Sequence, residues 1–234
     1  MIILISPAKT FIKNPPLSHQ KPLFLKESFV LQKKLALLSV EDIHQKMKLS
    51  NKLSETVFDY YQHLDKYHFK AIETYHGQVY KSLNYPSLNL TEQTYINHHV
   101  MIVSGLYGLL RPSDSIALYR LEIKDQIILN LYNYWNPIIK HYINHQMKHE
   151  IIISLLSIEY EKVINDIPHI TIVFESNHKI PSMMLKALRG KFLRLMAKND
   201  IKHVMALKEL NVDGFIYDDN LSTSSQFVFR RDEK

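Results

Sequence analysis

Short uninterrupted apolar runs recur along the chain and predict the strands of a buried sheet. Residues 2–5, 100–103, 151–156 and 169–174 are apolar at almost every position. Runs of this length without polar alternation are typical of strands that are covered on both faces. The first run, 2–5, therefore predicts a central strand rather than an edge strand.

Other segments carry apolar residues three and four positions apart, a spacing that predicts helices. Ser39 and Asp42 stand at the spacing of a capping box and mark one helix start. Residues 11–26 contain three prolines and predict an irregular surface arm, while runs 212–217 and 226–230 predict a terminal hairpin. The expected helices are about 27–38, 40–47, a segment ending near Asp65, a short helix from Thr91 to about 97, 131–147 and 182–194.

These elements predict the α+β class: a single compact domain over 1–234, with a mixed central sheet and surrounding helices. The chain has 234 residues, of which 46% are hydrophobic, which is enough for one substantial core. No repeat, low-complexity tract or linker divides it. No apolar run approaches the roughly 18 residues that span a bilayer, and the N-terminus has no basic region. We therefore expect a soluble cytoplasmic protein with no membrane partner, and we favour a monomer.

Charge and cysteine content narrow the classes of function. Lys and Arg number 29 against 23 Asp and Glu, giving a net charge of +6 and a pI of about 9.2. This excess favours a polyanionic partner, but enzymes of phosphorylated substrates share it, as do lysine-rich proteins encoded by AT-rich genomes. The absence of cysteine excludes disulfides, thiolate metal sites and a cysteine nucleophile, and it fits a reducing cytosol.

The stretch from Ser104 to Asp114 contains two of only five glycines, Gly105 and Gly108, directly after an expected strand. Glycine has no Cβ, so such a turn can bring bare backbone close to another group. Arg111 follows, held before a proline. The alternative interpretation is an ordinary strand-to-loop turn with an exposed arginine.

Two further segments are candidates for phosphate contact. Ser6 to Thr10 delivers a hydroxyl and Lys9 at the end of the first strand, where sites in α/β sheets gather. Residues 48–52 form a polar corner between two helices and carry Lys48 and Lys52. This corner predicts a helix-hairpin-helix-like element, although it lacks the usual glycines and an ordinary helical corner remains the alternative.

Charged residues also recur in two later segments. Alternation along 117–122 places Arg120 and Glu122 on one face, as neighbouring opposite charges. The helix that starts at Ser182 is the most basic, with Lys186 and Arg189 on one stripe and Gly190 inside it. An interior glycine costs about 1 kcal/mol against alanine, so we expect a close approach there.

Three histidines, His141, His145 and His149, recur every four residues in the expected helix 131–147 and beyond it. The i, i+4 spacing is a real metal geometry. No carboxylate lies in the same row, and metal sites usually need a third ligand with support around it. We predict no metal site and no cofactor.

Taken together, several segments resemble the YaaA peroxide-stress family over essentially the whole chain. The most specific is Ser-Gly-Leu-Tyr-Gly-x-Leu-Arg-Pro, combined with Ser-Pro-Ala-Lys-Thr at the N-terminus. The segments are 1–9, 49–53, 77–80, 104–114, 119–122, Tyr132 with Trp135, Glu159-Tyr160, Lys186 with Arg189-Gly190, Gly214-Phe215 and 227–229.

The resemblance implies a compact fold with a basic cleft, non-sequence-specific binding of double-stranded DNA, and a role in limiting damage from peroxide and unincorporated iron. Ala187 replaces a second lysine of the family pattern, and Asn51 stands where an acidic residue is common. The missing lysine at 187 weakens the inference that this chain binds DNA as the family does. The implied DNA- or phosphate-binding residues are Lys9, Lys52, Arg111, Arg120, Lys186 and Arg189.

Two alternatives stay open. The first is an enzyme that acts on a nucleotide, nucleobase or other phosphorylated small molecule, with a carboxylate as general base and the cations on phosphate. Its candidate catalytic residues are Ser6, Ser104, Tyr107, Tyr119, Glu122 and Glu159. The second is a structural protein whose polar residues satisfy one another in a buried network.

Overall fold

The computed structural model describes residues 1–66 and 68–231, and a seven-stranded mixed sheet forms its centre. The strand order is β4-β3-β1-β6-β7-β9-β8. Neighbours from β3 to β9 are parallel, whereas β4 and β8 pair antiparallel at the two edges. The strands are β1 (Ile2–Ile5), β3 (Val100–Ser104), β4 (Gly108–Leu110), β6 (Ile152–Leu155), β7 (Ile170–Ser176), β8 (Ile216–Tyr217) and β9 (Gln226–Arg231).

The predicted central strand is confirmed. All four residues of β1 are buried, and its residue Ile3 pairs with Val100 of β3 on one side and Ile153 of β6 on the other. A strand flanked on both sides and covered on both faces must be apolar throughout. This explains why the N-terminal run contains no polar residue before Ser6.

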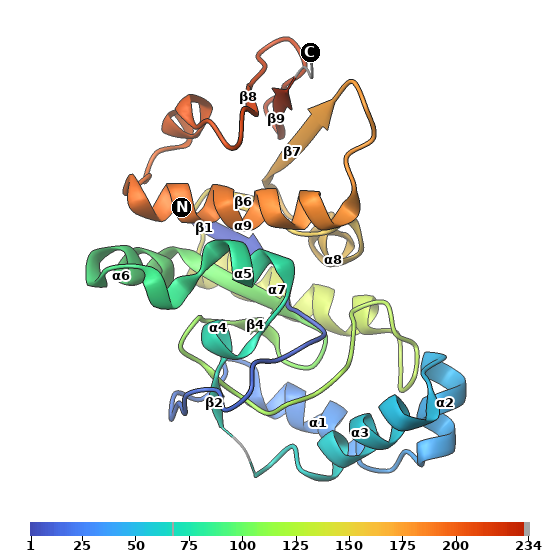
Figure 1. Ribbon diagram of the computed structural model, residues 1–234. Helices are drawn as coiled ribbons and strands as arrows, with labels where there is room; N and C mark the ends of the chain where they lie inside the picture. Colours follow the sequence, from blue (N-terminus) through green and yellow to red (C-terminus); the bar gives the residue numbers. More distant parts are fainter. Residues whose placement is uncertain (67, 232–234) are drawn as a thin grey trace.

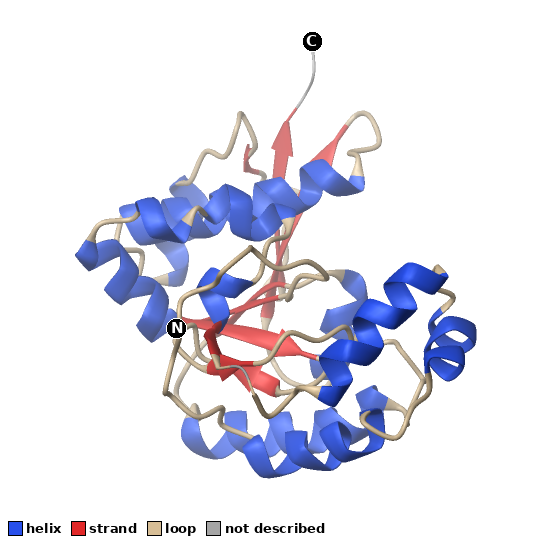
Figure 2. Cartoon of the chain, turned by 60° about the horizontal axis from the view of Figure 1, so that its bottom comes forward, coloured by secondary structure: helices blue, strands red, loops and turns tan. Residues whose placement is uncertain are grey.

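Helices surround the sheet, with the strands between them (Figure 2). The N-terminal helices α1, α2 and α3 lie at the opposite end of the molecule from β7 and β9 (Figure 1). No helix of the described chain is both long and apolar enough to cross a bilayer. The main helices are α1 (Leu25–Leu35), α2 (Val40–Met47), α3 (Asn51–Gln62), α5 (Gln78–Leu83), α6 (Leu90–His99), α7 (Leu131–Gln146) and α9 (Ser182–Lys198).

Shorter elements complete the architecture. A two-stranded sheet joins β2 (Phe69–Lys70) to β5 (Ser115–Ile116). The single-turn helices are α4 (Ala71–Thr74) and α8 (Ile158–Glu161), and the 3₁₀ segments are η1 (Tyr85–Ser87), η2 (Lys162–Ile164) and η3 (Val204–Glu209).

Local capping explains where two helices begin. Ser39 and Asp42 form the predicted capping box at the start of α2. At α6 the prediction of a start at Thr91 is wrong, because Asn89 forms a capping box with Glu92 and the helix begins at Leu90. Asparagine caps as well as serine or threonine, so the position of the apolar residues alone placed this start too late.

The predicted terminal hairpin is confirmed, because β8 pairs antiparallel with β9. Residues 117–122, in contrast, form no strand. They run as an extended segment in which Tyr119 and Leu121 are buried while Arg120 and Glu122 stay partly exposed. The alternation in the sequence therefore reports which side chains face inward, not a hydrogen-bonded strand.

The order of the strands creates a switch point at β1. The chain passes from β1 to β3 on one side and later returns to β6 on the other side, both parallel to β1. In open α/β sheets, ligands bind in the crevice outside the carboxyl ends of the strands at such a point. Here the segments that leave those ends begin at Ser6 and Leu156.

Candidate functional site

A cavity of about 320 Å³ lies at this switch point, and we call it the candidate pocket. Its walls come from the loop after β1, the start of α5, the segment 119–124, the turn after β6 and the helix α9. We call 119–124 the extended segment, and it ends in a turn at Ile123 and Lys124. The sequence-predicted residues that line it are Ser6, Lys9, Tyr119, Arg120, Glu122, Glu159, Lys186 and Arg189.

Serine side chains tie the two strand ends together at the pocket. The hydroxyl of Ser6 accepts a hydrogen bond from the backbone N–H of Ser157 at 2.9 Å. The Tyr80 hydroxyl donates to the carbonyl of Ser6 at 3.0 Å, which joins α5 to the same point. The loop after β1 is thereby held by both of its neighbours, and Lys9 projects from a fixed base.

Two glycines bring the pocket walls close together. A Cβ on Gly190 of α9 would overlap the carbonyl oxygen of Val79 in α5, and one on Gly105 would overlap the carbonyl oxygen of Leu121. The close approach expected at Gly190 is therefore to a neighbouring helix. At Gly105, the first glycine of the Gly-x-x-Gly turn, the approaching group is the extended segment and not a ligand, and at Gly108 it is the ring of Trp135.

Glu122 forms an ion pair with Lys9, whose Nζ lies 2.7 Å from Glu122 Oε2. Arg120 and Glu122 both line the pocket, as their position on one face predicted, but they form no ion pair in the described part of the chain. Alternation placed the two side chains on one side of the segment. It could not show that a lysine from the distant loop after β1 competes for the carboxylate.

Arg189 is the most enclosed cation of the pocket. Its Nε is buried and has no hydrogen-bond partner. Burial lowers the pKa of its guanidinium, and the nearby carboxylates of Glu161 and Glu159 act against that shift. Arginine stays charged in proteins, so Arg189 presents an incompletely compensated positive charge. Lys186, one turn earlier on α9, is exposed.

Glu159 is the second carboxylate of the pocket. Its Oε1 lies 4.0 Å from Nζ of Lys124. A hydrogen bond from its own backbone N–H, with smaller contributions from Ser157 and Lys124, lowers the pKa of Glu159. The carboxylate is therefore ionised at neutral pH and serves as a hydrogen-bond acceptor.

Tyr119 is fixed by a directed chain of hydroxyls. The Ser104 hydroxyl accepts from the backbone N–H groups of Leu106 and Tyr107, at 3.2 and 3.0 Å. With both lone pairs used, Ser104 donates to Tyr119 at 2.7 Å, and the Tyr119 hydroxyl is also hydrogen-bonded with the Tyr75 hydroxyl at 2.6 Å. Burial raises the pKa of Tyr119 to about 12, so the phenol stays protonated.

The two predicted candidates from the Gly-x-x-Gly turn do not line the pocket. Ser104 is buried behind Tyr119 in the hydroxyl chain, and the Tyr107 hydroxyl accepts from the backbone N–H of Ala117 at 3.0 Å. Burial strongly raises the pKa of Tyr107. Both residues position the extended segment from the inside.

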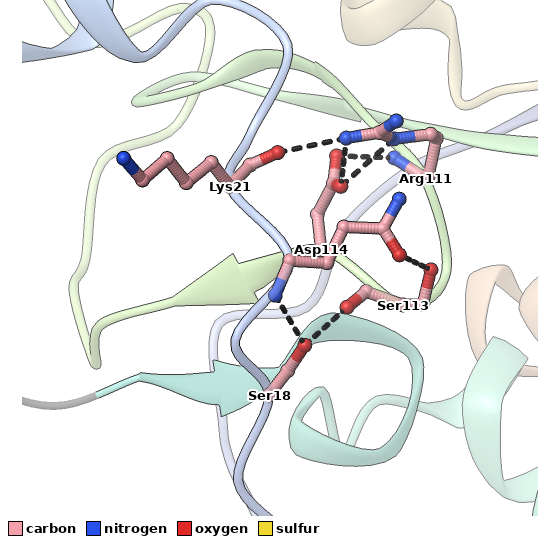
Figure 3. A network of polar contacts seen from close by, with 6 residues as sticks. Ser18, Lys21, Arg111, Ser113 and Asp114 are labelled. Atoms are coloured by element: carbon pink, nitrogen blue, oxygen red, sulfur yellow. Dashed lines mark hydrogen bonds and ion pairs between the residues drawn. The ribbon is translucent and has the colours of Figure 1, made fainter.

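Arg111 lies in a separate cluster (Figure 3). Its Nε donates to Asp114 at 2.9 Å, its terminal nitrogen lies 2.7 Å from the same carboxylate oxygen, and it also donates to the carbonyl of Lys21 at 2.7 Å. Asp114 is fully buried. Beside this pair, the Ser18 hydroxyl donates a hydrogen bond to the backbone carbonyl of Ser113 at 2.5 Å. Arg111 thus closes the N-terminal arm onto the turn and does not join the pocket.

Lys52 also lies outside the pocket, in the first turn of α3, and is exposed. Nine residues later Tyr61 donates a hydrogen bond to the carbonyl of Arg120, a pocket residue. At 1.5 Å per residue, Lys52 stands about 13 Å along the helix axis from this contact. α3 therefore supports the pocket at one end and carries Lys52 away from it.

The histidine row is shorter than the sequence predicted. α7 ends at Gln146, so His149 lies beyond it, while the rings of His141 and His145 stack at 4.1 Å. The ring Nδ1 of His145 is hydrogen-bonded with the carbonyl oxygen of His141. Among the described residues, no three His, Asp or Glu side chains are grouped so as to hold a metal ion.

Sequence reasoning missed several residues that line the pocket. Lys124 continues the alternation of Arg120 and Glu122, and this signal could have identified it. Tyr80 stands in a segment that supported the family resemblance but received no role. Ser157 and Tyr160 flank Glu159, so the candidate carboxylate marked the correct turn.

The sequence is similar to known proteins over almost its whole length. Residues 1–221 match the family model described as "Peroxide stress protein YaaA". A "UPF0246 protein" of Clostridium beijerinckii is 34% identical over 99% of this chain and 98% of its own. Another from Clostridioides difficile is 33% identical over 98% and 99%, and one from Legionella pneumophila is 31% identical over 99% of both chains.

Proposed function

Because this chain belongs to the peroxide stress protein YaaA family, we propose that it binds double-stranded DNA without reading its sequence and thereby protects DNA from peroxide. The bound protein covers the backbone and keeps iron and peroxide away from it. Phosphate contacts of this kind carry affinity but no sequence information.

One observation carries the proposal: five cations and only two carboxylates line one hollow. The cations come from three separate segments. Lys9 follows β1, Arg120 and Lys124 stand on the extended segment, and Lys186 and Arg189 stand on α9. Cations gathered from segments so far apart in the sequence favour an anionic ligand over incidental surface charge.

The corner between α2 and α3 is a second basic surface, outside the pocket. Lys48 and Lys52 are both exposed there, and Lys48 adopts the left-handed conformation that ends α2. Since B-DNA carries one charge per roughly 1.7 Å of axis, the roughly 13 Å of α3 up to Lys52 corresponds to about eight phosphates. A duplex lying along α3 thus contacts the corner and the mouth of the pocket together.

The test is a salt series with duplexes of unrelated sequence, followed by fluorescence anisotropy. Each phosphate contact contributes a slope of about −0.9 to the logarithm of the binding constant against that of salt. Three to five contacts therefore give a slope of about −3 to −5 for every sequence. Absence of binding at low salt, or binding of one sequence only, overturns the proposal.

Matched lysine variants locate the surface. Lys186→Ala and Lys52→Ala each lower the affinity and reduce the slope by about one contact. Lys140→Ala is the control, because Lys140 is paired with Asp166 at 2.7 Å on α7 and lies outside the pocket. Equal losses for Lys140→Ala and Lys186→Ala would mean that binding follows net charge alone.

A second candidate is an enzyme for a phosphorylated small molecule, favoured by the pocket volume of about 320 Å³ and by its two carboxylates. Pockets for small ligands begin at about 300 Å³. Glu122 and Glu159 would orient the ligand or accept a proton, with the cations on its phosphate. Calorimetry with nucleoside monophosphates and sugar phosphates tests this candidate, and turnover of one of them would make it the primary function.

A further inference from the structure

An intact duplex cannot enter the candidate pocket. A sphere with the volume of the pocket, about 320 Å³, is only about 8–9 Å across, whereas the major groove of B-DNA alone is about 12 Å wide. Phosphates of paired DNA therefore reach the mouth of the pocket but not its interior. Arg189, whose Nε is buried, is the most enclosed of the pocket's cations.

The mouth and the interior of the pocket differ in chemistry. The side chains of Lys9 and Lys124 are 49% and 50% exposed and form the mouth. The interior is lined by Tyr80, Tyr119 and Tyr160, of which none is more than 6% exposed. Charges at the entrance and aromatic rings inside match the two halves of a nucleotide, its phosphate and its base.

Protein groups already use the hydroxyls of Tyr80 and Tyr119, so the small surface that these residues leave to the pocket is aromatic carbon. Tyr80 donates to the carbonyl of Ser6, and the Tyr119 hydroxyl lies between Ser104 and Tyr75. Glu122 and Glu159 complete the lining with acceptor oxygens. Exocyclic amino groups of bases are the donors such oxygens bind. Binding of a phosphate backbone alone requires neither rings nor carboxylates.

We propose that the candidate pocket holds a single nucleotide, with its base among the buried tyrosines and its phosphate between the mouth lysines and Arg189. In DNA this nucleotide is one that is unpaired and turned out of the duplex. The assignment of this nucleotide to DNA rests on the proposed function. A free nucleoside monophosphate offers the same base and phosphate to the pocket and does not depend on DNA binding.

The duplex arm of the test compares two bulged duplexes that differ by one base. In one, the single bulged nucleotide carries adenine; in the other it is abasic, so that flexibility and charge are equal. The adenine bulge is expected to bind about tenfold tighter, since stacking and hydrogen bonding of one base are at stake. Equal affinity for the two bulges overturns the assignment of the nucleotide to DNA.

A variant that fills the pocket separates its interior from its mouth. Ser157→Leu adds bulk at the pocket wall, and the Ser6 contact to the Ser157 backbone N–H does not need the serine side chain. It is expected to remove the preference for the adenine bulge and to weaken binding of matched duplex much less. Retention of the full preference in a folded Ser157→Leu protein contradicts the proposal.

Free adenosine monophosphate, titrated into the unaltered protein and into Ser157→Leu, forms the second arm of the test. Binding that is lost in Ser157→Leu, without any DNA binding, would overturn the proposed function and support a free nucleotide as the ligand. Matched-duplex binding without bulge preference or monophosphate binding would retain the proposed function and overturn the single-nucleotide site.

Discussion

Arg111 and Arg189 are two arginines with opposite surroundings. The guanidinium of Arg111 forms an ion pair with the buried carboxylate of Asp114 and donates a hydrogen bond to the carbonyl of Lys21. Arg189 lies in a pocket wall with a buried Nε that has no partner. The first arrangement is complete without any ligand. The second leaves a largely desolvated charge that Glu161 and Glu159 compensate only in part, which favours binding of an anion there.

The sequence favoured the first of these sites, because its motif is compact. Ser104 to Asp114 places glycines, a tyrosine and an arginine within eleven residues. The pocket instead draws single residues from five segments between Ser6 and Arg189. A dense motif is therefore no guide to whether its charges are free to bind. Pairing in the folded chain decides that.

Replacing Arg111 gives the largest expected effect. Arg111→Met leaves the carboxylate of Asp114 buried without its partner, and burial already raises the pKa of that carboxyl. Breaking one side of a buried pair costs about 3–5 kcal/mol, measured by urea unfolding. DNA affinity per folded molecule is expected to stay unchanged. A loss of affinity with full stability would show that Arg111 contacts the ligand.

Gly190→Ala is expected to lower both the unfolding free energy and the affinity for DNA. The added Cβ overlaps the carbonyl of Val79, so α9 must move away from α5 and carry Arg189 with it. Strain of this kind costs about 1–3 kcal/mol of unfolding free energy. Affinity for DNA falls in the same variant. Ala187→Gly is the control, since it removes a Cβ one turn away on the same helix and moves no wall.

Arg189→Met isolates the ligand contribution. One charge-assisted hydrogen bond is worth about 1.5–3 kcal/mol, so DNA affinity is expected to fall about tenfold or more. Stability is expected to change by less than about 1 kcal/mol, because no carboxylate is paired with Arg189 alone. The comparison with Arg111 fails if Arg189→Met unfolds as readily as Arg111→Met.

Much of the fold was predictable from the sequence, since local patterns specify it. The apolar run 2–5 identified the central strand, and the Ser39–Asp42 pair identified the start of α2. The candidate residues that gather in the pocket were also identified one by one. Their pairing was not, because an ion pair such as Lys9–Glu122 joins residues 113 positions apart. Short-range spacing carries no information about such contacts.

Glu122→Gln is expected to raise DNA affinity by a few fold. The change releases Lys9 from its 2.7 Å ion pair and removes a negative charge from the mouth of the pocket. Pairs between partly exposed groups are worth up to about 1 kcal/mol, which limits the gain. Binding titrations at one salt concentration measure it. If Glu122 also accepts a hydrogen bond from the amino group of a base, Glu122→Gln raises the affinity for the adenine bulge less than the affinity for matched duplex.

The smallest expected effect concerns pH and the carboxylate behind Arg189. The hydrogen bond to Glu161 raises the pKa of His169, whose Nε2 lies 3.4 Å from Glu161 Oε1. Burial alone would raise the pKa of Glu161, but the bonds from His169, Thr171 and Ser154 outweigh it and lower the pKa. Around neutral pH, His169 is the member of this group that titrates.

A raised histidine pKa has a defined consequence for stability. The protonated form is favoured in the folded state, so its contribution is complete below the unfolded pKa of about 6.5 and is lost as pH rises through the folded value. Unfolding free energy is therefore expected to decline above about pH 6.5, and His169→Gln is expected to flatten that decline. Glu161 also opposes the burial cost of Arg189. Glu161 stays ionised, but neutral His169 no longer offsets its negative charge, which then acts more strongly on Arg189. DNA affinity is therefore expected to fall slightly over the same pH range, and an unchanged affinity would show that Glu161 does not influence ligand binding by Arg189.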